Sequence, residues 1–166
     1  MRKKSVVVMT LITAFLMMYT TIAQATGSRP MPVRERIEGS LTAMPVVAPE
    51  GRCSELALLL SYAGEGTLSR IGKVTFTTTH CSYLTPEGQP TGRYGEAEMV
   101  LVTGNGDEIH ATYEGRQLDE TRYLEFMRIR GGTGEFTNAR GSILEIVAVD
   151  LTTFDVSIRG WGWIAY

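Results

Sequence analysis

Runs of β-forming residues separated by turn residues are the feature that most constrains the fold of this chain. Helical periodicity is almost absent: ELALLLSYA (55–63) could begin a helix, but it is short and Gly-Glu-Gly follows it. The other runs are rich in Val, Ile, Thr and Phe, which suit a pleated surface. The pattern predicts an all-β domain.

The turn residues divide the chain into eight expected strands. They are expected at 33–46, with Gly39 as a bulge or bend, at 55–64 and 72–83, at two positions within 95–115, and at 121–130, 141–150 and 154–166. Asn105-Gly106 predicts a hairpin with a type I′ turn, because both residues tolerate positive φ. Residues 84–95 are expected to form a long exposed loop.

Short connections between these strands favour antiparallel neighbours, because parallel pairing would need long crossovers. An open sheet of eight strands would expose two edges, and closure removes them. We therefore expect an eight-stranded antiparallel closed β-barrel, whose interior is filled by side chains or holds one small ligand. A two-sheet sandwich is the competing architecture, and the residues alone do not exclude it.

The N-terminus has the layout of a secretory signal. Three basic residues precede an apolar run, and small residues at Ala23 and Ala25 fit a cleavage site. The alternative is a transmembrane anchor, but threonines interrupt the run and no stable membrane anchor is expected. We expect a signal peptide at 1–25, a flexible segment at 26–32 and a single barrel domain at 33–166, secreted or periplasmic and of a bacterial kind.

Charge and cysteine content exclude several classes of function. The leader carries three of the 16 basic residues and none of the 18 acidic ones, so the rest is net −5, and nucleic acid is not an expected partner. The run MPVRERI, with Glu35 between two arginines, is interpreted as a solvated strand face. Cys53 and Cys81 are the only cysteines, and in an oxidising compartment one disulfide is the simplest prediction.

Metal binding is the alternative for the cysteines. His80 lies beside Cys81, but neighbours on a strand point to opposite faces and make a poor chelating pair. No other cluster has metal-ligand spacing, and no nucleophile motif is present. We therefore expect no metal, no cofactor and no assigned catalytic residue.

The glycine-rich stretch IRGGTGEFTNARGS (129–142) raises the question of phosphate binding. It lacks the Lys-Ser/Thr of a P-loop, and a strand rather than a helix is expected to follow it, unlike in a Rossmann fingerprint. We interpret Gly131, Gly132 and Gly134 as a structural loop, with Phe136 plugging one barrel mouth.

The same stretch carries a resemblance to known families. Gly131 to Phe136 followed by Ala139-Arg140-Gly141 resembles the GGTGxFxxARG element of plant dirigent proteins. It is also similar to the GGTGRFxxAxG element of bacterial exported proteins with an allene-oxide-cyclase-like barrel. The resemblance implies an eight-stranded barrel with a central cavity that acts as a mould, either for phenoxy-radical coupling or for closure of a fatty-acid epoxide. Such barrels are often trimers, so a homo-oligomer is left open.

Alternation along the later strands suggests which polar side chains face the lumen. Tyr113 shares the apolar face of its strand, whereas His110 is expected in solvent. Glu125 lies on the face of Met127 and Ile129 and is a candidate cavity acid with a raised pKa, although the opposite face of that strand could equally point inward. The expected ligand-lining residues are Tyr113, Glu125, Phe136 and Arg140.

In two later strands the sequence does not show which side chains point into the barrel. Glu145 lies in a strand that is apolar on both sides. Trp161 and Trp163 either face outward or are rotated inward by a bulge at Gly160.

Three functions fit these residues. The first is an exported barrel that binds a small apolar or aromatic molecule without turning it over. The second is a dirigent- or cyclase-like catalyst (an isomerase, if an enzyme) that uses Arg140, Tyr113 and Glu125. The third is a protein-interaction or inhibitor module that uses an exposed surface at Trp161 and Trp163.

Overall fold

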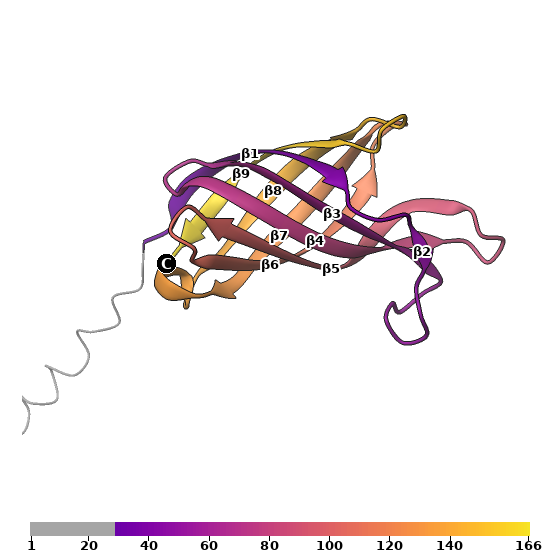
Figure 1. Cartoon of the computed structure of the whole chain (residues 1–166), viewed down its shortest axis with the longest axis horizontal. Coiled ribbons are helices and arrows are strands. Elements are labelled where there is room, and N and C mark those ends of the chain that lie inside the picture. Colours follow the sequence, from indigo (N-terminus) through magenta and orange to yellow (C-terminus); the bar gives the residue numbers. More distant parts are fainter. Residues whose placement is uncertain (1–28) are drawn as a thin grey trace, which may run out of the picture.

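The computed structural model describes residues 29–166 as one all-β barrel (Figure 1). The predicted signal peptide at 1–25 and most of the predicted flexible segment 26–32 lie outside the described residues. The strands are β1 (Met31–Leu41), β2 (Val46–Val47), β3 (Ala57–Leu68), β4 (Gly72–Leu84), β5 (Pro90–Thr103), β6 (Glu108–Gln117), β7 (Arg122–Gly132), β8 (Arg140–Val149) and β9 (Val156–Ala165), with a 3-10 turn, η1 (Gly134–Phe136), before β8. No helix in this described range is long and apolar enough to cross a membrane.

The barrel is closed by β1, which pairs with strands from both ends of the domain. β1 is antiparallel to β9 along 31–39 and antiparallel to β3 along 35–41. All other sequence neighbours from β3 to β9 also pair antiparallel, so eight long strands form one continuous wall, and β2 adds two residues beside β3. The prediction of a closed eight-stranded antiparallel barrel is confirmed, and the sandwich alternative is wrong.

The core of the domain is the barrel interior, built by alternate residues of each strand. On β6 the inward set is Ile109, Ala111 and Tyr113, as the alternation predicted. The register across β8, β9 and β1 is continuous, so Trp161 and Trp163 face outward, with exposed fractions of 52% and 38%. No bulge at Gly160 rotates them inward.

Several predicted boundaries are wrong because tertiary pairing extends or shortens the strands. β5 begins at Pro90, a position that a first strand residue tolerates without an N–H, so the expected loop at 84–95 shrinks to 85–89. β3 continues through Gly64 and Gly66, which were expected to end it. Gly39 is not a bulge: its pairing is regular, and a Cβ there would lie 2.6 Å from Cζ of Phe76.

The hairpin at Asn105-Gly106 is confirmed, but its predicted type I′ turn is wrong. Gly106 has φ +90°, whereas Asn105 is not among the residues with positive φ. The Gly106 N–H donates to the Thr103 carbonyl, and the Thr103 N–H donates to the Asp107 carbonyl. The connection is therefore a three-residue loop, 104–106, in which only Gly106 supplies the left-handed conformation.

The predicted disulfide between Cys53 and Cys81 is present and fastens a loop to the outside of the barrel wall. Cys81 faces away from the lumen while its neighbour His80 faces into it, as expected for adjacent strand residues. Cys81 and Tyr83 form a small second core with Ala57 beneath the 48–56 loop. Such a disulfide is typical of proteins in oxidising compartments.

Loss of this disulfide should destabilise the barrel without opening it. The bond closes a loop of 28 residues, so a Cys53→Ala/Cys81→Ala double variant should lose about 3–4 kcal/mol of unfolding free energy in the chain-entropy treatment. Urea unfolding followed by circular dichroism measures this loss. The unreduced, denatured wild-type protein should contain no free thiol, and finding two thiols would refute the pairing.

Candidate functional site

The barrel lumen contains a cavity of about 290 Å3. Leu151 and Phe154, in the β8–β9 turn, line its outer part and are half-exposed, so the cavity reaches the barrel end where this turn lies. Most of the other lining side chains are apolar or aromatic, among them Leu60, Phe76, Met99, Val147, Val156 and Ile158. This volume and lining are those of a small-molecule site rather than of a filled core.

The opposite barrel end is closed by the glycine-rich stretch. Phe136 in η1 is fully buried, and its ring lies 4.6 Å from that of Tyr166. Gly134 has φ +52°, and a Cβ on Gly132 would overlap the Glu108 carbonyl. These glycines therefore allow the turn that brings Phe136 over the mouth, in agreement with their interpretation as a structural loop.

One wall of the cavity combines aromatic rings with hydrogen-bonding groups. His80 stacks on Tyr94 with ring centroids 4.6 Å apart, and its Nδ1 lies 2.8 Å from the Tyr113 hydroxyl. That hydroxyl also lies 2.9 Å from Thr78 Oγ1. Burial lowers the pKa of His80 to about 4, so the imidazole is neutral at physiological pH.

Three buried carboxyl groups lie inside the barrel along one transverse row of its wall. The strand registers align Glu35, Gly160, Glu145, Glu125, Gly115 and Tyr94 on β1, β9, β8, β7, β6 and β5, in that order. Each of the three glutamates is at most 5% exposed, and Glu125 lines the cavity.

The glycines make room for the polar groups of this row. A Cβ on Gly160 would lie 2.8 Å from Glu145 Cγ and 3.0 Å from Glu35 Oε2. A Cβ on Gly115 would overlap the ring of Tyr94, whose hydroxyl donates to Glu125 Oε2 at 2.8 Å.

Burial changes the protonation of the three carboxyl groups. Desolvation raises the pKa of Glu35, and it raises the pKa of Glu125 to about 7. The pKa of Glu145 is raised well above its usual value by desolvation and by the negative charges of Glu35 and Glu125. Glu145, in the middle of the row, therefore keeps its proton at neutral pH.

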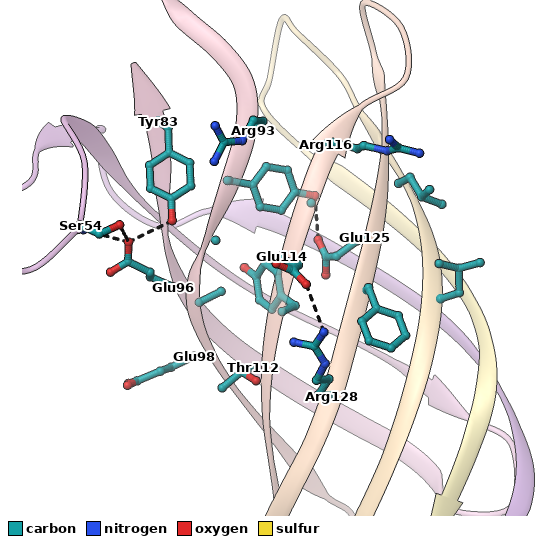
Figure 2. A pocket seen from close by; sticks show the side chains of 18 of the residues that line it. Ser54, Tyr83, Arg93, Glu96, Glu98, Thr112, Glu114, Arg116, Glu125 and Arg128 are labelled. Atoms are coloured by element: carbon teal, nitrogen blue, oxygen red, sulfur yellow. Dashed lines mark hydrogen bonds and ion pairs between the residues drawn. The ribbon is translucent and has the colours of Figure 1, made fainter. Parts of the chain in front are cut away.

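A bulge in β5 directs Tyr94 into the lumen. Gly95 and Glu96 together oppose a single residue of β6, and Glu96 adopts φ +49°. The Glu96 carboxylate holds this conformation by accepting hydrogen bonds from Ser54 and from the Tyr83 hydroxyl (Figure 2). Because Ser54 follows Cys53, the disulfide-bound loop supports the bulge and, through it, the position of Tyr94.

An open groove of about 860 Å3 lies along β5, β6 and β7, and its lining includes Tyr94, Tyr113 and Glu125, which also line the lumenal cavity (Figure 2). Its labelled side chains are mostly charged, and Arg128 pairs with Glu114 at 3.3 Å. Exposed pairs of this kind contribute little binding energy. The lumen, with its buried and convergent polar groups, is the better candidate site.

The predicted ligand-lining residues do not all come together. Tyr113 and Glu125 line the same cavity, and the inward facing of Glu125 settles the ambiguity of its strand. Phe136 closes the opposite mouth, and Arg140 is exposed at the start of β8, away from the cavity lining. His110 is in solvent, as expected, and lies 2.7 Å from Glu108.

Sequence reasoning missed part of the row and of the aromatic wall. Glu35 was placed on a solvated face, and this is wrong: its two arginine neighbours face outward and leave it inside. A signal was available, because Val33, Glu35 and Ile37 alternate with the arginines. The sequence did not show whether Glu145 points into the barrel or away from it. Tyr94 lies in the segment that was expected to be a loop.

Comparison with solved structures supports the fold. The structure is similar to that of the pterocarpan synthase dirigent protein GePTS1, with a TM-score of 0.57, at 19% sequence identity over 88% of this chain and 96% of that chain. No protein-family model matches the chain, and no curated protein matches it. At this identity the likeness shows a dirigent-like barrel fold.

The buried carboxyl groups should make stability fall as pH rises. An unfolded glutamate loses its proton near about 4.3, whereas folded Glu125 keeps it to about 7, so the folded state binds more protons in between. His80 acts oppositely between about pH 4 and 6.5, and above that range the carboxyl groups act alone. Glu125→Gln should therefore be more stable than wild type at pH 8, by on the order of 3 kcal/mol.

Urea unfolding at pH 5, 6.5 and 8 measures this difference. Glu98→Gln, at an exposed position on β5, is the matched control and should follow the wild-type profile. A wild-type unfolding free energy that does not fall between pH 6.5 and 8 would contradict the assigned carboxyl burial.

Proposed function

We propose that this protein binds one small apolar or aromatic molecule in its barrel lumen and does not turn it over. The observation that carries this proposal is the cavity of about 290 Å3, which combines an apolar lining with a few convergent polar groups. An engineered cavity of about 150 Å3 in another protein holds benzene, so this lumen has room for one aromatic ring with a short side chain.

Export to an oxidising compartment is part of the same proposal. The Cys53–Cys81 disulfide supports it, together with the signal-like N-terminus of the sequence. A secreted or periplasmic barrel of this kind would sequester or carry its ligand. The bound molecule would be shielded from water on all sides but one, since Phe136 closes the other end.

A dirigent- or cyclase-like catalyst is a second candidate, and one observation favours it. Glu125, with its pKa raised to about 7 by burial, lines the cavity beside the Tyr94 hydroxyl and can give a proton to a bound intermediate or take one from it. Arg140, which is exposed, is not part of this version. If a catalytic activity is found, Glu125→Gln and Tyr113→Phe should each lower its rate. An unchanged rate in both variants would contradict a catalytic role for these two residues.

Filling the lumen should abolish ligand binding. Val147 lines the cavity, and Val147→Phe would occupy part of its volume, whereas Ala148→Phe places the same ring on the exposed face of the same strand. Calorimetric titration with single-ring aromatic molecules of differing side-chain polarity should show binding to wild type and to Ala148→Phe, and a loss of at least tenfold in Val147→Phe.

Overpacking is a known risk of such a variant, so circular dichroism should first show that it is folded. Val149→Phe, nearer the open end, serves if Val147→Phe does not fold. A lumenal site would be contradicted if Val147→Phe and Val149→Phe both still bind the ligand. It would also be contradicted if no member of the panel binds the wild-type protein.

A further inference from the structure

The lumen holds more hydrogen-bond acceptors than its own donors can satisfy. Within residues 29–166, five buried carboxylate oxygens have no donor: both oxygens of Glu35, both of Glu145 and Oε1 of Glu125. A proton on Glu145 supplies one donor to this group, and Tyr94 already donates to the remaining oxygen, Glu125 Oε2. Buried polar atoms without partners are rare in folded proteins, so this surplus needs an explanation.

No cation of the described chain offsets these carboxyl groups inside the barrel. His80 on β4 is neutral, and the other titratable groups that face the lumen are tyrosines. Arg93 reaches the cavity rim, but its side chain is 59% exposed and pairs with Glu55 at 3.5 Å. No group of three His, Cys, Asp or Glu side chains in the described range has the geometry to hold a metal ion.

The aromatic groups around Glu125 suit a positively charged occupant. Tyr62, Tyr94, Tyr113 and Tyr123 line the same cavity. The Tyr94 and Tyr123 rings lie 5.5 Å apart, and Tyr94 directly contacts the Glu125 carboxylate. The electron-rich faces of such rings attract an ammonium group, most strongly where water is excluded.

We propose that the lumen binds a primary arylalkylamine, a molecule with one aromatic ring and a short chain ending in an ammonium group. Its ring would lie among the cavity's apolar and aromatic side chains, and its ammonium group would donate to Glu125 Oε1. This inference rests on the proposed lumenal binding and names the ligand class for it. A neutral phenol brings one donor to the acceptor-rich wall, whereas an ammonium group brings three donors and the missing charge.

Binding of such a cation should be coupled to proton release. Glu125 accepts the ammonium group as a carboxylate, so any proton it carries at neutral pH leaves to solvent when the amine binds. Besides desolvation, the neighbouring Glu145, Tyr94 and Glu35 set this equilibrium, and His80, which faces the same interior, is neutral. Affinity should therefore weaken as pH falls below about 7.

The test compares three probes of one shape by calorimetry at pH 6 and pH 8: 2-phenylethylamine, neutral 2-phenylethanol and anionic 3-phenylpropionate. At pH 8 the amine should bind about ten- to a hundredfold more tightly than the alcohol, the range of a hydrogen bond to a charged group. The anion should bind more weakly than both. Titrations near pH 7 in buffers of different ionisation enthalpy should detect the released proton.

Glu125→Gln should bring the amine-to-alcohol affinity ratio to about one, because the amide keeps the shape and the acceptor for Tyr94 but loses the charge. Glu98→Gln, which is exposed, should keep the wild-type ratio. If the alcohol binds wild type as tightly as the amine, or if Glu125→Gln keeps the preference, the amine inference is overturned and lumenal binding stands. If none of the three probes binds, both the inference and the proposed function are overturned.

Discussion

The pairing of β1 with both β9 and β3 is the constraint on which the rest of this structure depends. It joins the last strand of the domain to its first long hairpin and leaves the barrel wall without an open edge. Most inward side chains are consequently buried, whatever their chemistry. A lumen closed at one end by Phe136 and open at the other is the direct result.

Within that lumen the transverse row of glutamates works against stability. Desolvation raises the pKa of each carboxyl group, and the negative charges of Glu35 and Glu125 raise the pKa of Glu145 further. Glycines at positions 115 and 160 give the tyrosine and the carboxyl groups their space, so the row is built by the backbone as well as by the side chains. Perturbed carboxyl groups converging on a cavity are typical of functional sites, and a filled apolar core would not need them.

The disulfide-bound loop links the outer surface of the barrel to this site. Ser54 and Tyr83 hold the Glu96 carboxylate at the β5 bulge, and the bulge turns Tyr94 inward. An element that was expected only to stabilise the fold therefore also positions a hydroxyl group that contacts Glu125.

Local patterns in the sequence predicted most of the strands, the Asn105-Gly106 hairpin and the disulfide, because each depends on residues close in the chain or on a single possible pair. Which side chains point into the barrel was harder to predict. The bulge at Gly95 and Glu96 shifts the inward phase of β5, so Tyr94 and Met99 both face inward although they are five residues apart. β8 is apolar on both faces, and only its register with β7 and β9 shows that Glu145 points inward.

The most direct test of this account is an NMR titration that follows the side-chain carboxyl carbons of Glu35, Glu125 and Glu145. Burial in the lumen predicts that all three titrate above the usual glutamate range, with the pKa of Glu125 at about 7 and the pKa of Glu145 raised well above its usual value. Three signals that titrate together near about 4.3, the value of a solvated glutamate, would contradict the burial of these groups and the site built on it.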